Sequence, residues 1–74
     1  MKIPMISGLE VIKRLRKAGF IAVRQKGSHV RLEKRIEEGM IKLTVPLHDE
    51  MKKGTLNRII KDAGLTLEEF ESLK

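Results

Sequence analysis

The spacing of apolar residues along the chain changes from a helical period to an alternating one and back again. In residues 8–19 apolar and small side chains recur at intervals of three and four, which predicts an amphipathic helix. In residues 29–34 and 40–45 apolar and polar side chains alternate, which is typical of strands with one buried face. The helical period returns in residues 56–63. The pattern therefore predicts the element order α-β-β-β-α.

Capping residues mark the ends of the first predicted helix. Ser7 and Glu10 form a capping box, and Gly19 is suited to the left-handed backbone that ends a helix. The predicted buried stripe comprises Gly8, Val11, Ile12, Leu15, Ala18 and Gly19. The cations predicted to point away from this stripe are Lys13, Arg14, Arg16 and Lys17. Their face is either a phosphate-binding surface or a merely solvated one.

The β-like runs predict strands at residues 20–26, 29–34 and 40–45, with a polar connection at residues 35–39. Gly27 and Ser28 supply turn residues between the first two strands. Such short connections favour an antiparallel meander. Alternation gives the sheet one apolar face that packs on helices. The opposite face is predicted to carry His29, Arg31, Lys42 and Thr44.

The remainder of the chain predicts a loop at residues 47–53, a second long helix and a short terminal one. The long helix opens at Gly54 and ends at Gly64, and Thr66 with Glu69 forms a second capping box. Because each long helix buries one stripe, both can cover the apolar face of the sheet. We therefore predict an α+β sandwich of two layers with a three-stranded antiparallel sheet, similar to the double-stranded-RNA-binding fold.

Length and composition narrow the class of protein. A chain of 74 residues predicts one domain, spanning residues 1–74. The absence of cysteine excludes disulfides and thiolate metal sites and fits a reducing compartment. Residues 1–6 are too short for the apolar core of a signal peptide, and no run approaches the length of a membrane span. We expect a soluble cytoplasmic protein that does not contact a membrane.

Positive charge is concentrated in the first half of the chain. The net charge is +6, but residues 1–35 hold ten Lys and Arg against two acids, a net +8, whereas residues 36–74 are net acidic. One cationic face favours nucleic acid as the partner, with a solvated surface rich in lysine as the alternative. There is no Trp or Tyr, and Phe20 and Phe70 are predicted core residues. Contacts to RNA should therefore go to phosphates, 2′-hydroxyls and shape.

His29 is the side chain best suited to proton transfer near neutral pH, and cations surround it in the sequence. RNA carries its own nucleophile, the 2′-hydroxyl, so a ribonuclease needs only to remove a proton, orient the phosphate and neutralise developing charge. His29 is thus a candidate general base, or else a plain strand histidine on a solvated face. The predicted RNA-binding residues are Arg24, Lys26, Gly27, Ser28, Arg31 and Lys42.

Other chemistries need residue constellations that the chain does not supply. His29 and His48 lie nineteen positions apart, and no HxxxH, HExxH or paired-carboxylate spacing is present, so we expect no metal and no other cofactor. Ser28 precedes His29 in a strand and would face the opposite side, which argues against a serine nucleophile activated by this histidine.

Several short motifs, in one order and spacing, resemble the HicA toxins of type II toxin-antitoxin systems. The resemblance runs from about Ser7 to Phe70. The matching segments are Gly19-Phe20, Gln25-Lys26-Gly27-Ser28-His29, Thr44-Val45-Pro46-Leu47-His48, Lys53-Gly54-Thr55-Leu56, Ile59-Ile60 and Ala63-Gly64-Leu65. The resemblance implies an RNA interferase that cleaves messenger RNA, with His29 as its catalytic histidine. It also implies a HicB-type antitoxin that covers the active site and represses the shared operon.

Two other functions are compatible with the sequence. A non-catalytic double-stranded-RNA-binding module would use the same basic face but would not need His29. A protein-interaction domain would use that face only to meet an acidic partner. Cleavage of RNA would distinguish a ribonuclease from both of these alternatives. Affinity for RNA at low salt would distinguish the RNA-binding module from the protein-interaction domain.

Overall fold

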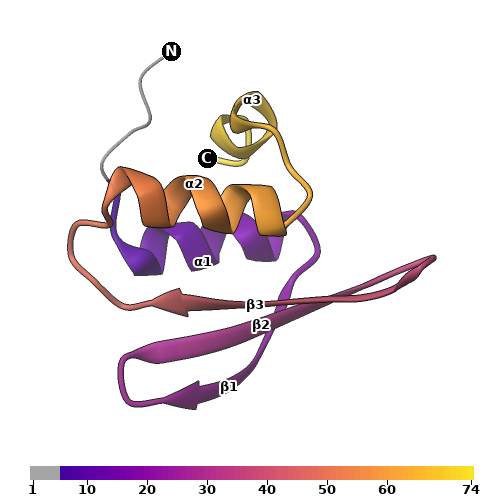
Figure 1. The fold of residues 1–74 in the computed structure, drawn as a ribbon, viewed down its shortest axis with the longest axis horizontal. Coiled ribbons are helices and arrows are strands. Elements are labelled where there is room, and N and C mark those ends of the chain that lie inside the picture. Colours follow the sequence, from indigo (N-terminus) through magenta and orange to yellow (C-terminus); the bar gives the residue numbers. More distant parts are fainter. Residues whose placement is uncertain (1–5) are drawn as a thin grey trace.

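A computed structural model of the chain describes residues 6–74, so that the prediction about a signal peptide in residues 1–6 falls almost entirely outside the described residues. The described chain forms three helices and three strands (Figure 1). In chain order these are α1 (Gly8–Lys17), β1 (Ile21–Lys26), β2 (His29–Ile36), β3 (Gly39–Pro46), α2 (Lys53–Asp62) and α3 (Leu67–Glu71).

The three strands form one antiparallel sheet in the order β1-β2-β3. Helices α1 and α2 lie side by side over one face of this sheet, and α3 lies beyond them (Figure 1). The predicted α+β sandwich is therefore confirmed. The opposite face of the sheet has no helix over it, and we call it the open face.

The hairpin between β2 and β3 is longer than the sequence predicts. Residues 35–39 were expected to form a polar connection, but Arg35 pairs with Met40 and Ile36 pairs with Gly39. Only residues 37 and 38 remain as the turn. The tip of the hairpin projects past the helices (Figure 1), so its residues have no apolar layer to face. Regular alternation, the signal by which strands are recognised, is therefore absent there.

The core lies between the sheet and the helices. Both predicted helical stripes and the alternating positions of β2 and β3 contribute to it, and the prediction that Phe20 and Phe70 are core residues is confirmed. Burial of each large aliphatic side chain contributes roughly 1.5–3 kcal/mol. The buried apolar residues are Val11, Leu15, Phe20, Val30, Leu32, Leu43, Val45, Met51, Leu56, Ile59, Ile60, Ala63 and Phe70.

Arg14 does not point to solvent, and the prediction that it does was wrong. Only 5% of this residue is exposed, and its guanidinium lies 5.0 Å from the centre of the Phe70 ring. Helix α3, which the helical period of α1 cannot reveal, brings Phe70 over Arg14. The Arg14 Nε donates a hydrogen bond of 3.0 Å to the Glu10 carboxylate. This bond is the main reason that the pKa of Glu10 lies below its usual value.

The two predicted capping boxes differ in the structure. The Thr66 box is complete, because Thr66 Oγ1 accepts from Glu69 N at 3.1 Å and the Glu69 carboxylate accepts from Thr66 N at 2.9 Å. At the start of α1 only half of the box forms, with Ser7 Oγ accepting from Glu10 N at 3.1 Å. The Glu10 carboxylate accepts from Arg14 instead.

The start of α1 touches the segment that follows β3. The Gly8 N–H donates to the His48 carbonyl at 2.9 Å, and a Cβ at Gly8 would collide with the Pro46 carbonyl oxygen. On the other side of this segment, the Leu47 N–H donates to the Ser28 carbonyl at 2.7 Å. Helix α1 and the β1–β2 turn are thereby joined through residues 46–48.

Candidate nucleic-acid interface

Strand register brings four of the predicted site residues onto the open face. His29 lies opposite Lys26 of β1, and Arg31 lies opposite Arg24. Arg31 also lies opposite Thr44 of β3. Residues directly opposite each other in a sheet point to the same side. The buried neighbours Val30 and Leu32 face the helices, so this whole group faces away from them.

A β-bulge at Val23 makes this arrangement possible. Ile21 pairs with Glu33 and Arg24 pairs with Arg31, so both lie on the open face although they are three positions apart. In a regular strand, residues three positions apart point to opposite sides. Val23 is the extra residue of the bulge and has no partner in the register of β2, so that the residues after it point to the open face again. If Val23 were instead paired with β2 in a regular strand, Arg24 and Lys26 would turn toward the helical side of the sheet.

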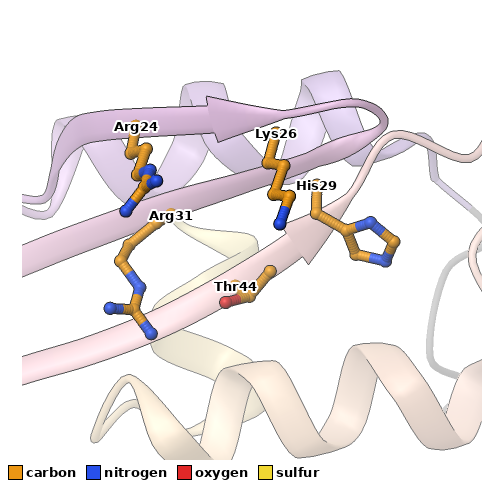
Figure 2. Close-up of a pocket in the computed structure, with 5 residues that line it drawn as sticks. All are labelled: Arg24, Lys26, His29, Arg31 and Thr44. Carbon is orange, nitrogen blue, oxygen red and sulfur yellow. The ribbon is translucent and has the colours of Figure 1, made fainter.

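A shallow cleft of about 260 Å³ lies over these strands. Figure 2 shows Arg24 and Lys26 reaching from β1 across the sheet, with Thr44 on β3 and His29 at one end of the group. No carboxylate lines this cleft, and none of its cations makes an ion pair within residues 6–74. The cleft therefore carries uncompensated positive charge that suits a phosphate. Its lining residues are Arg24, Lys26, His29, Arg31 and Thr44.

The turn before His29 is held on both sides. Gly27 has a φ of 59°, the left-handed conformation that glycine adopts without strain. The Gln25 side chain donates to the Gly27 carbonyl at 3.1 Å, and the Ser28 carbonyl accepts from Leu47. His29 is the first residue of β2 and is exposed. Its ring lines the first cleft and makes no hydrogen bond to any described residue.

The other predicted RNA-binding residues lie elsewhere. Gly27 and Ser28 form the turn before His29 and line neither this cleft nor the cleft between β3 and α2. Lys42 lies further along β3 and lines a second cleft, between β3 and α2, which Arg31 and Thr44 also line. The alternation of apolar and polar residues correctly predicted that Thr44 lies on the open face, where it lines the first cleft. It was not among the predicted RNA-binding residues.

Helix α2 contributes functional candidates that sequence analysis missed. Thr55, Arg58 and Asp62 line the second cleft. Their spacing of three and four residues is a detectable signal, since it places them on one face of a helix. That signal shows which residues share a face, but not that this face lies beside β3.

His48 lies in the loop after β3, and its side chain is exposed and makes no hydrogen bond to a described residue. The loop is held through backbone groups, as described for Gly8. Residues 6–74 contain no group of three or more His, Cys, Asp or Glu side chains that could hold a metal ion. In the same part of the chain, no helix has the length and apolar character needed to cross a membrane.

The fold is a small α+β sandwich, and the cations of the cleft on its open face make no ion pair within residues 6–74. These two features are typical of nucleic-acid-binding proteins, which makes the chain a candidate for this class. Comparison with protein families narrows this class. The family described as "HicA toxin of bacterial toxin-antitoxin" matches residues 8–65, most of the chain. The chain therefore belongs to the HicA toxin family. Comparison with curated proteins gave no match.

Proposed function

We propose that this toxin is a metal-independent endoribonuclease that cleaves messenger RNA and so arrests translation and growth. The observation that carries the proposal is the position of His29 at one end of a cleft that, within residues 6–74, has three unpaired cations and no carboxylate. A base and a phosphate-binding group side by side are what cleavage of RNA by its own 2′-hydroxyl requires. Membership of the HicA family supports the toxin assignment.

In the proposed reaction the phosphate of RNA lies against Arg31 and Lys26, and His29 accepts the proton of the adjacent 2′-hydroxyl. The 2′-oxygen attacks the phosphorus, and the bond from phosphorus to the 5′-oxygen of the next nucleotide breaks. The products are a 2′,3′-cyclic phosphate and a 5′-hydroxyl, whose proton comes from solvent at this exposed site. The cations balance the charge that develops on the phosphate oxygens. A single base accelerates such a step roughly 10²–10⁴-fold, so the enzyme should be slow.

The proposed partner is a HicB-type antitoxin that presents acidic side chains to the open face. The net charge of +6 and the unpaired cations of the first cleft support this charge complementarity. A protein that covers the cleft would exclude RNA and neutralise the toxin. The cytoplasm, where messenger RNA is translated, is the proposed location of both proteins.

The test is a comparison of the wild-type chain with His29→Ala. Wild-type expression should arrest growth and deplete messenger RNA, whereas the variant should do neither. In purified form, the variant should lose cleavage by about 10²–10⁴-fold while it still binds RNA. Wild-type cleavage should continue in the presence of a chelator. Full toxicity of His29→Ala would contradict the proposed role of His29, and RNA binding without cleavage by the wild type would indicate a binding module instead.

A further inference from the structure

The cleft between β3 and α2 is a second polar hollow, of about 370 Å³. Lys42 and Thr44 come from β3, and Thr55, Arg58 and Asp62 come from successive turns of α2. All five side chains are exposed, and they stand above Leu43 and Ile59, which are buried core residues. Buried core residues thus form the floor of this hollow, and exposed polar side chains form its walls.

The two clefts adjoin each other. Arg31 and Thr44 line both of them, so the two clefts together extend from His29 over β3 to α2. Neighbouring strands lie about 4.8 Å apart, so the path from β1 to β3 alone covers about 10 Å. A ligand that follows this path must bend from the open face around the edge of the sheet.

The charges along this path favour a polyanion. Neither Lys42 nor Arg58 makes an ion pair in the described part of the chain. Asp62 is the one carboxylate in the lining of the second cleft, one helical turn from Arg58, yet it does not pair with it. Arg58 is therefore available to a phosphate, while Asp62 can accept a hydrogen bond from a sugar hydroxyl or a base amino group.

We propose that the RNA strand cleaved beside His29 continues over β3 into the second cleft, where Arg58 and Lys42 bind a further phosphate. This inference rests on the proposed ribonuclease function. The substrate it implies is single-stranded RNA, because a flexible strand can bend around the edge of the sheet and a short duplex resists bending. The chain has no Trp or Tyr for stacking bases, so phosphate contacts must supply most of the affinity.

The experiment measures RNA binding by the whole 74-residue chain carrying His29→Ala, so that the RNA stays intact. A single-stranded RNA of twelve nucleotides is titrated at several salt concentrations with two further variants. Arg58→Gln removes the proposed contact. Lys61→Gln is the matched control, since Lys61 is an exposed cation on the same helix and lines neither cleft. Each phosphate contact to a single strand contributes about −0.7 to the slope of log affinity against log salt.

Arg58→Gln should weaken binding about tenfold at low salt and reduce the salt slope by about 0.7, whereas Lys61→Gln should change the slope by much less. The loss caused by Arg58→Gln should shrink as the RNA is shortened, because a short strand ends before α2. Equal slopes for the two variants would overturn the inference. So would an effect of Arg58→Gln that is the same for RNAs of all lengths.

Failure of this inference is distinguishable from failure of the proposed function. If the wild type cleaves RNA and His29→Ala does not, but Arg58→Gln behaves like Lys61→Gln, only the path over β3 is wrong. If the wild type neither binds nor cleaves RNA, both proposals fall. Tighter binding of a duplex than of a single strand, unaffected by Arg58→Gln, would also overturn the proposed path.

Discussion

Arg31 occupies a central position among the residues of the open face. It is the one cation that lines both clefts, and it lies opposite Arg24 on one side and Thr44 on the other. Two like charges across adjacent strands repel each other, so this pair weakens the sheet slightly. An anion bound between them would remove that repulsion. The arrangement therefore costs some stability in the free protein and favours phosphate binding.

Replacement of Arg31 should impair the proposed ribonuclease more than replacement of a cation outside the clefts. We expect Arg31→Gln to lower kcat/KM for RNA cleavage by about 10–100-fold, because a charged hydrogen bond to phosphate is lost. Lys52→Gln removes the same charge outside the two clefts and should leave kcat/KM nearly unchanged. Steady-state kinetics on one RNA at fixed salt measures both effects. Equal effects of the two variants would mean that only net charge matters.

Glu10 offers a test at low pH. Its pKa is lowered in the folded protein, chiefly by the hydrogen bond from Arg14, so the stability it contributes is present above its unfolded pKa. That contribution is lost as the pH falls through the folded pKa. Glu10→Gln should therefore unfold at a lower urea concentration than the wild type at pH 7. The difference should shrink as the pH falls through the folded pKa, because Glu10 itself then becomes protonated. A difference that is constant with pH would contradict the role of its charge.

Among the elements, α1 and β3 approach each other closely at the end of the sheet that carries His29. Gly8 lets the first turn of α1 approach the backbone at Pro46, and its N–H bonds the His48 carbonyl. Pro46 lies opposite His29 in the sheet. The close approach at Gly8 therefore fixes both the packing of α1 and the position of the strand end beside the candidate base.

Two glycine variants test this close approach. Gly8→Ala should destabilise the fold by about 1–3 kcal/mol, because the added methyl group must displace backbone of the segment after β3. Gly54→Ala is the control, since nothing lies within 4 Å of a Cβ at that helical position. It should stabilise the fold by about 0.5–1 kcal/mol. Urea denaturation of both variants gives the comparison, and a neutral Gly8→Ala would show that the backbone there can move.

The elements show what the sequence could and could not predict. The spacing of apolar residues was sufficient to predict α1, β2, β3 and α2, because each of these elements buries a periodic stripe of side chains in the same core. Strand β1 is exposed along its whole length, so its bulge left no trace in an apolar pattern. The burial of Arg14 depends on α3, which contacts α1 only after the chain has folded. The second cleft was likewise missed, since it depends on which face of α2 lies beside β3.

For the molecule as a whole, the open face has two different ends. The first cleft carries the positive charge near His29. At the other end, Ile21, Val23 and Met40 remain 66%, 49% and 45% exposed. They line a more apolar hollow together with Gly19, Glu33, Lys34 and Arg35. The opposite side of the molecule holds α3 (Figure 1). Phe70 of α3 is fully buried, and its ring lies under Arg14 of α1. The site and the element that completes the core are therefore on opposite sides.

Because of this separation, loss of Phe70 should act through stability alone. Phe70→Ala should cost about 3–5 kcal/mol. A domain of 74 residues has a total stability of about 4–11 kcal/mol, so a large part of it would be lost. Phe70→Leu should cost much less. Thermal unfolding should show a lower Tm for Phe70→Ala and an unchanged Tm for His29→Ala. A folded but inactive Phe70→Ala would instead place α3 in the site.

The bulge in β1 affects how chains of this family should be aligned. The sheet pairs Ala22 with Leu32 and Arg24 with Arg31, so a chain that lacks the position of Val23 would keep both pairs. The pairing of β1 with β2 therefore does not fix how many residues separate Gly19, at the end of α1, from the Gly-Ser-His motif. A one-residue gap at this point of an alignment would leave the cationic side chains on the same face, whereas a gap between Arg24 and His29 would not.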